Sequence, residues 1–259
     1  MDYKSVADFL SNNLRLRTLP VAVHFLKSAE PPEKARRPSK AMGKKITLCQ
    51  AITLARSYGW TMAISKEDLQ CVPALIGFGL ARVADQTKAL GRLMAKMSYA
   101  KDDTAGAGEI SSLQLLPSGT CDTLVIGPLA KTVSCPDAVI LYGNPAQMAR
   151  LSQAWTYSSG SRVPSNVGGK VECVEYVIAP YKTASARITI PGIGDRIFSM
   201  TQDDEMVFSL PGNKLQIIVN GLEEAGRKVG ARYPITFYQN FQPDFPSSHK
   251  ELAKEEGID

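Results

Sequence analysis

The residues with the greatest capacity for chemistry in this sequence are its five cysteines, Cys49, Cys71, Cys121, Cys135 and Cys173. No two of them have the C-x-x-C spacing, so the local patterns of zinc knuckles and ferredoxin-type clusters are absent. Their odd number, together with an N-terminus that lacks an apolar signal region, favours reduced thiols over disulfides. Thiolates suit soft metals and clusters, and here a site would need the fold to gather distant thiols.

One cysteine occupies a position with chemical meaning. The segment Thr47–Tyr58 predicts a helix, because Ile46, Cys49 and Ile52 recur at helical spacing and Gly59 follows. Cys49 would lie in the first turn, where backbone amides favour negative charge and lower the pKa of a thiol. A thiolate ligand or a nucleophile would be stabilised there.

The two histidines do not support a hydrolytic site. His24 lies in the predicted strand Val21–Leu26, and His249 lies in a polar C-terminal segment. Neither has a cysteine or carboxylate at ligand spacing, which argues against histidine-based zinc hydrolysis and a Ser-His-Asp triad. We expect His24 to be a hydrogen-bonded strand residue.

A second candidate site begins at a predicted helix start. Asn144 is expected to cap this helix, with Pro145 in its first turn. Helix N-termini bind anions through free amides, so Asn144, Gln147 and Arg150 could hold a small acid or an organic cofactor. Arg196, which follows the PGIGD turn, is the fourth candidate residue.

The order of predicted elements favours an α+β fold, with a mixed β-sheet flanked by helices in a single domain over residues 1–259. Thr123–Ala130 and Asp137–Gly143 are predicted to be neighbouring buried strands. We interpret Lys101–Glu109 as a flexible connector, with a subdivision near 101–120. A strand–turn–helix pattern recurs after Asp137 and after Glu205, which suggests a duplicated β-α unit.

Composition narrows the class of protein. Of the 259 residues, 44% are hydrophobic and the net charge is +5, which excludes a disordered or coiled-coil chain. The longest apolar runs are too short to span a bilayer, so we expect a cytoplasmic protein with no membrane partner. Neither a dinucleotide-binding nor a nucleotide-triphosphate motif is present.

The densest positive charge lies in Lys34–Lys45, which is predicted to be a surface loop. No aromatic residue occurs between Phe25 and Tyr58, so nucleic acid is a disfavoured partner. We expect this loop to flank the mouth of the pocket that Cys49 faces.

Three stretches, PVAVHFLK, LCQAITLARSYG leading to CVPALIGFGL, and NPAQMARLSQAWTYSSG, together carry a resemblance to a known family. The sequence resembles the domain-of-unknown-function 169 family, which is found mostly in archaea and anaerobic bacteria. That family brings no established activity. The resemblance implies characteristic cysteines at Cys49, Cys71 and Cys173, and we expect these three to converge in space.

Two functions from different classes follow. The first is a protein that holds an iron–sulfur cluster or another thiolate-bound metal through Cys49, Cys71 and Cys173, with Cys135 or Cys121 as a fourth ligand. The second is a metal-free module that binds an anionic small molecule at helix N-termini. Whether the chain is an enzyme stays open, because a nucleophilic Cys49 has no visible base. A small-molecule ligand or a redox partner is expected in either case.

Overall fold

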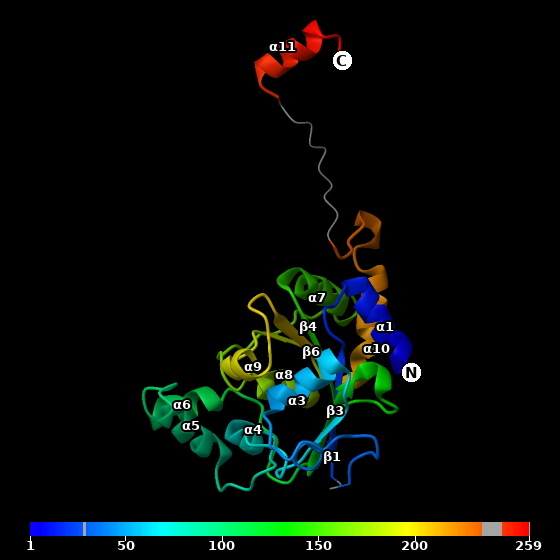
Figure 1. Cartoon of the computed structure of the whole chain (residues 1–259). Coiled ribbons are helices and arrows are strands. Elements are labelled where there is room, and N and C mark those ends of the chain that lie inside the picture. The colour runs from blue at the N-terminus through cyan, green and yellow to red at the C-terminus, as the bar shows by residue number, and fades with distance from the viewer. Residues whose placement is uncertain (28–29, 235–244, 259) are drawn as a thin grey trace.

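The computed structural model describes residues 1–27, 30–234 and 245–258. Its described residues form an open six-stranded sheet in the order β2-β3-β1-β4-β6-β5 (Figure 1). The strands are β1 (Val21–Leu26), β2 (Met62–Ile64), β3 (Thr123–Pro128), β4 (Ala138–Gly143), β5 (Arg187–Thr189) and β6 (Met206–Leu210). All neighbouring strands of this sheet run antiparallel, and the parallel pairs among the described residues are three isolated bridges. The predicted α+β class is confirmed, with an antiparallel sheet.

Helices cover both faces of the sheet. They are α1 (Tyr3–Leu14), α2 (Pro38–Ala41), α3 (Leu48–Tyr58), α4 (Val72–Gly77), α5 (Gln86–Lys96), α6 (Asp103–Ile110), α7 (Pro145–Ser159), α8 (Glu172–Thr183), α9 (Ile193–Phe198), α10 (Leu215–Glu224) and α11 (Ser247–Glu255), with short 3₁₀ turns η1 (Leu129–Lys131), η2 (Gly212–Lys214) and η3 (Arg227–Val229). One core lies between the sheet and α3, α4 and α8. The other lies under α1, α7 and α10.

The strand register contains an internal repeat. In each half of the chain the first strand is central, the third lies beside it and the second forms the edge. When Ala22 is matched with Val139 and Gly127 with Leu210, every β4–β6 pair coincides with a β1–β3 pair. The same match carries every β5–β6 pair onto a β2–β3 pair. The two halves are therefore related by a pseudo-twofold axis at the central pair Ala22–Val139.

The repeat extends to the helices. Helix α3 packs across β1, β2 and β3, and α8 packs across β4, β5 and β6 on the same face. The short helix α4 follows β2, as α9 follows β5. The expected β-α repeat is also present, since β4 leads to α7 and β6 leads through η2 to α10. In these two units, the strands β4 and β6 belong to the three-strand repeat, whereas the helices α7 and α10 do not.

The start of α7 follows the sequence prediction. Asn144 caps the helix, Pro145 occupies its first turn, and Asn144 and Gln147 exchange the two hydrogen bonds of a capping box. The apolar side chains of this helix lie in the core beneath it; they are Met148, Leu151 and Trp155. The predicted cap and first turn of this helix are confirmed.

Two predictions about the chain path are wrong. The strands β3 and β4 are not neighbours, because β1 lies between them and pairs with both. The segment Lys101–Glu109 is not a flexible connector but contains most of α6, which Asp102 caps. Helix α6 packs closely on α5, where Gly91 and Gly106 allow the two backbones to approach. Glycine in this segment therefore allows close packing of two helices and does not indicate a flexible connector.

Burial of α7 gives a direct test of the fold. Leu151 is fully buried, so Leu151→Ala should lower the free energy of unfolding by about 2–5 kcal/mol through lost transfer energy and a residual cavity. Urea unfolding measures the change. Tyr157 lies on the same helix but is exposed, and Tyr157→Ala should change stability by less than about 0.5 kcal/mol. Equal losses in the two variants would contradict the orientation of α7.

Candidate functional site

Two cysteines meet at the N-termini of the equivalent helices α3 and α8. Cys49 is the second residue of α3, and Cys173 is the second residue of α8. Both side chains are buried, and the Cys49 thiol lies close enough to act on the protonation of Cys173. The interaction with the Cys49 thiol, with burial as the next cause, raises the pKa of Cys173 well above its ordinary value. The pseudo-twofold repeat thus brings together thiols from opposite halves of the chain.

A third thiol lies beside this pair. Cys71 is the N-cap residue of α4 and is partly exposed. Burial raises its pKa, and negative charge on Cys49 and Asp195 acts in the same direction. Helix α4 contacts α8, while α9 contacts α3, so each short helix reaches the long helix of the other half. Cys49, Cys71 and Cys173 form what we call the thiol cluster.

The carboxylate of Asp195 binds several elements at this point. Its Oδ1 accepts hydrogen bonds from Tyr176 Oη at 2.8 Å and from Tyr142 Oη at 3.2 Å. Its Oδ2 accepts from the backbone nitrogen of Gly192 at 3.1 Å, and the thiol of Cys49 is near enough to lower the pKa of this carboxyl. Asp195 therefore links α9 to β4, α3 and α8.

Burial controls protonation around Asp195. Its side chain is 2% exposed, and desolvation raises its pKa although the hydroxyl donors act in the opposite direction. The pKa values of Tyr142 and Tyr176 are also raised well above normal, first by burial and then by the charge of Asp195. Both hydroxyls consequently remain protonated donors at neutral pH.

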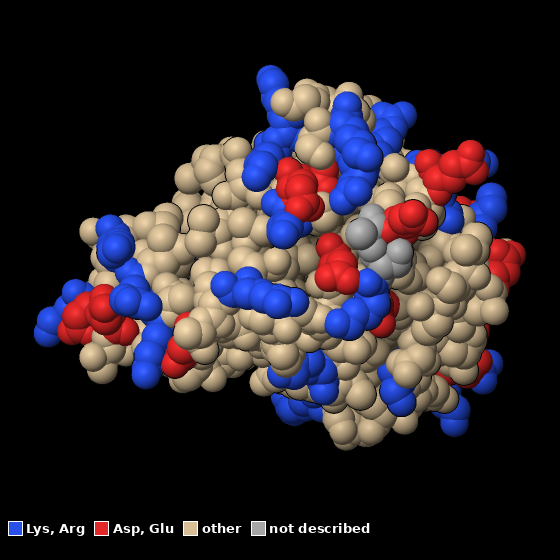
Figure 2. All heavy atoms as spheres, turned by 90° about the horizontal axis from the view of Figure 1, so that it is seen from below, with Lys and Arg blue, Asp and Glu red and all other residues tan. Residues whose placement is uncertain are grey.

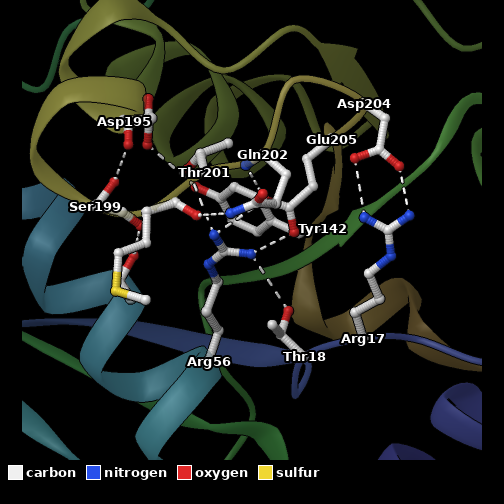
Figure 3. Close-up of polar contacts among 12 residues, drawn as sticks. Arg17, Thr18, Arg56, Tyr142, Asp195, Ser199, Thr201, Gln202, Asp204 and Glu205 are labelled. Atoms are coloured by element: carbon white, nitrogen blue, oxygen red, sulfur yellow. Dashed lines mark hydrogen bonds and ion pairs between the residues drawn. The ribbon is translucent and has the colours of Figure 1, made fainter.

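A buried ion pair between Arg56 and Glu205 lies against the ring of Tyr142 (Figure 3). Arg56 of α3 binds Glu205 through two contacts, Nη1–Oε1 at 2.7 Å and Nη2–Oε2 at 3.1 Å. The guanidinium carbon lies 4.0 Å from the centre of the Tyr142 ring, in a cation–π contact. Thr53 also donates to the backbone oxygen of Ser199 at 2.7 Å. These contacts fix the segment after α9 onto α3.

Glu172 holds the chain that leads into α8. Its Oε1 accepts hydrogen bonds from the backbone nitrogens of Gly168 and Gly169, both at 2.6 Å. Its Oε2 accepts from Thr189 Oγ1 of β5 at 2.6 Å. Burial nevertheless raises its pKa. Glu172, the residue before Cys173, thus has a structural role, because it positions the chain segment that precedes α8.

The two other cysteines have partners outside the thiol cluster. Cys121 is buried, and its Sγ donates to the backbone oxygen of Phe78 at 3.6 Å; burial raises its pKa to about 11. Cys135 is exposed beside Tyr3 of α1, where its Sγ contacts the oxygen of Pro136. The fourth ligand that the sequence interpretation assigned to Cys135 or Cys121 therefore stays a prediction.

The thiol cluster is not a preformed metal centre. Within residues 1–27, 30–234 and 245–258, no group of three or more His, Cys, Asp and Glu side chains has an arrangement that could hold a metal ion. The Cys49 thiol instead interacts with Cys173 and Asp195. Metal binding would require these thiols to lose their protons and to rearrange around the ion.

The residues expected to bind an anion at a helix start do not form one site. Asn144 and Gln147 cap each other, and Gln147 Nε2 donates to the oxygen of Leu14 at 2.7 Å. Arg150 donates to the oxygens of Leu222 and Ala225 at the end of α10. Arg196 lies on α9, where it contacts Gln202 and Asp203. Arg150 also lines a cavity near the end of α10.

The histidine and the basic loop have ordinary structural partners. His24 Nε2 lies 2.7 Å from Thr132 Oγ1, and burial lowers its pKa, in agreement with a hydrogen-bonded strand residue. In the basic segment, Arg36 stacks on Trp60 and Arg37 pairs with buried Asp68. On the face seen from below, Lys and Arg side chains are interspersed with Asp and Glu (Figure 2). Residues 28–29, which precede the expected surface loop, lie outside the described residues.

A family model and a curated relative match this chain. The family model of uncharacterised ArCR proteins, domain-of-unknown-function 169, matches residues 10–221. The chain belongs to this family. A curated relative, the uncharacterized protein MJ0308 of Methanocaldococcus jannaschii, is 24% identical over 224 residues, which cover 86% of this chain and 96% of the relative. No solved structure matches this domain-of-unknown-function 169 chain.

The helices in the described part of this family member do not include a candidate membrane-spanning helix. None of the helices there has both the length and the apolar character needed to cross a membrane.

Sequence reasoning missed most of the polar residues of the site. The sequence pattern places Asp195 in a tight turn and Tyr142 in a strand, and it indicates no role for Arg56. One signal was present: Gly192 and Asp195 have the spacing of an N-cap and a third helical residue, where an acidic side chain binds back to the cap backbone. The link from Asp195 to Tyr142 and Tyr176 had no local signal.

The buried ion pair and its neighbour form a natural comparison. Replacing Arg56 by Met leaves Glu205 buried without a cation, so it should lower the free energy of unfolding by about 3–5 kcal/mol. Arg17 pairs with the adjacent Asp204 at the surface, and Arg17→Met should cost less than about 1 kcal/mol. Denaturant unfolding at pH 7 measures both. Similar losses would show that the Arg56–Glu205 pair is not desolvated.

The raised pKa of Asp195 predicts a defined pH dependence. Between its unfolded pKa and its higher folded pKa, the folded chain keeps a proton that the unfolded chain has lost, so stability falls as pH rises. Asp195→Asn removes this contribution. Urea unfolding from pH 4 to pH 8 should show the variant gaining stability relative to the original chain as pH rises, whatever their constant offset. A difference independent of pH would mean that Asp195 titrates normally.

Proposed function

We propose that this protein binds a soft metal ion or an iron–sulfur cluster through the thiol cluster, with Cys49 and Cys173 as the primary ligands and Cys71 as the third. The observation that carries the proposal is the meeting of Cys49 and Cys173 at equivalent helix positions. Thiolates are the side chains that such cofactors prefer. The partners of such a protein are small ligands or redox proteins, and its free thiols suit the reducing conditions of the cytoplasm.

Helix electrostatics support thiolate formation at this point. Helices α3 and α8 have 11 and 12 residues, and both begin at the thiol cluster. The partial positive charge of each N-terminus stabilises a thiolate on the second residue. Without a cation, the carboxylate of Asp195 and the neighbouring thiol act in the opposite direction and keep Cys173 protonated. A bound cation would reverse this balance and release the thiol protons.

The access route favours Cys71 as the third ligand. Cys71 is partly exposed, whereas Cys49 and Cys173 are buried. A metal ion entering from solvent would therefore meet Cys71 first and then the buried pair. On the side of α9, a side chain at Gly194 would come within 3.6 Å of Cys49 Sγ, so this glycine leaves space beside the buried thiol.

The metal-free alternative has less support at its expected place. The amides and side chains at the start of α7 already satisfy one another through Asn144 and Gln147, so that helix terminus has little capacity left for an anion. Binding of a metal or cluster by the thiol cluster is therefore better supported than binding of an anion at the start of α7.

Cobalt titration tests the proposal. Reduced protein, handled without oxygen, is titrated with Co²⁺, and thiolate-to-cobalt charge-transfer absorption is recorded. We expect saturable absorption that Cys49→Ser and Cys173→Ser each abolish and that Cys71→Ser weakens. Cys121→Ser and Cys135→Ser are matched controls, one buried and one exposed, and should bind as the original chain does.

Anaerobically purified protein provides the second measurement. Iron and acid-labile sulfide that are lost together in Cys49→Ser and Cys173→Ser would identify a cluster. The proposal is wrong if Cys49→Ser and Cys135→Ser show the same metal content and the same cobalt spectrum.

A further inference from the structure

The buried arginines of the described chain differ in how their charge is compensated. Arg56 and Arg150 are 2% and 6% exposed. Arg56 has the carboxylate of Glu205, but the hydrogen bonds of Arg150 go only to neutral groups: the backbone oxygens of Leu222 and Ala225, and Oε1 of Gln153. Burial accordingly lowers the pKa of Arg150. Buried charges in proteins are normally paired, so Arg150 lacks a counter-ion among the described residues.

Arg150 also retains hydrogen-bonding capacity. A guanidinium carries five N–H donors in a fixed plane, and the bonds of Arg150 to described residues use three of them. The two carbonyls at the end of α10 fix its orientation. A rigid guanidinium with free donors is suited to bind a carboxylate or phosphate group.

Arg150 lines a cavity of about 420 Å³ between the end of α1, α7 and the segment after α10. Two further arginines, Arg15 and Arg232, line the same cavity, and none of the lining residues that the structure describes is acidic. Its other walls come from Asn12, Asn13, Leu222, Tyr233 and Pro234. The cavity lies at the α1, α7 and α10 side of the sheet, opposite the thiol cluster.

Tyr233 adds a neutral donor. Its hydroxyl oxygen accepts a hydrogen bond from Asn144 Nδ2 at 3.0 Å. A phenol can accept and donate at once, so the Tyr233 proton remains able to donate to a ligand. Asn144 thus orients a cavity residue instead of contacting an anion itself.

We propose that this cavity binds a small organic oxyanion, a molecule that carries a phosphate or carboxylate group, through Arg15, Arg150, Arg232 and Tyr233. The cavity is larger than a lone oxyanion needs, and Leu222 and Pro234 offer apolar contact to an organic part. This site is independent of the thiol cluster and of any metal there.

Binding of two probe anions tests the site. Inorganic phosphate and citrate are titrated separately by calorimetry, with ionic strength held constant by KCl. We expect saturable one-site binding of at least one probe, weakened about tenfold by Arg15→Gln and by Arg232→Gln, because each removes charge-assisted hydrogen bonds. Tighter binding of phosphate would indicate a phosphorylated ligand, and tighter binding of citrate a polycarboxylate.

Arg92→Gln is the matched control. Arg92 is an exposed arginine of α5, outside the cavity, so its replacement removes the same charge and should leave probe binding unchanged. Arg15 and Arg232 are also exposed, so their replacement should preserve the thermal unfolding temperature of the unliganded chain. Absence of saturable binding of both probes, or equal binding by all three variants, would overturn the proposal.

Discussion

The carboxylate of Asp195 is buried where the two halves of the fold meet, and the arrangement around the thiol cluster depends on it. It accepts hydrogen bonds from Tyr142 on β4 and Tyr176 on α8, and it contacts Cys49 on α3. A charge this deeply buried is costly unless several donors compensate it. The donors come from separate elements, so the cost of burial is offset only when those elements are correctly packed together.

The pseudo-twofold repeat explains why thiols from distant parts of the chain meet. Equivalent helices α3 and α8 begin at the axis, and each carries a cysteine as its second residue. The repeat is not strict in its polar residues. Helices α4 and α9 have the same length, but α4 has Cys71 as its N-cap and Ala74 as its third residue, where α9 has Gly192 and Asp195. One half therefore supplies an additional thiol, and the other supplies the carboxylate.

A buried arginine lies on each face of the sheet, and the charges of the two are compensated differently. Arg56 is buried with Glu205 and the face of Tyr142, so its charge is compensated within the protein. Arg150 is buried against the carbonyl oxygens at the end of α10, which carry only partial charge. This difference separates a structural arginine from one that is suited to bind a ligand. The proposed thiol and oxyanion sites use the two faces of one sheet.

The sequence by itself determined the elements whose signals are local. The strand β1, the cap and orientation of α7, and the helix that starts at Cys49 depend on hydrophobic period and capping residues, which act over a few positions. It did not determine strand order: β1 enters between β3 and β4 because pairing depends on contacts remote in sequence. The polar partners of Cys49 were equally hidden. Asp195, Tyr142 and Tyr176 become neighbours only when β4, α8 and α9 pack, since their hydrogen bonds form in a buried space that no local pattern encodes.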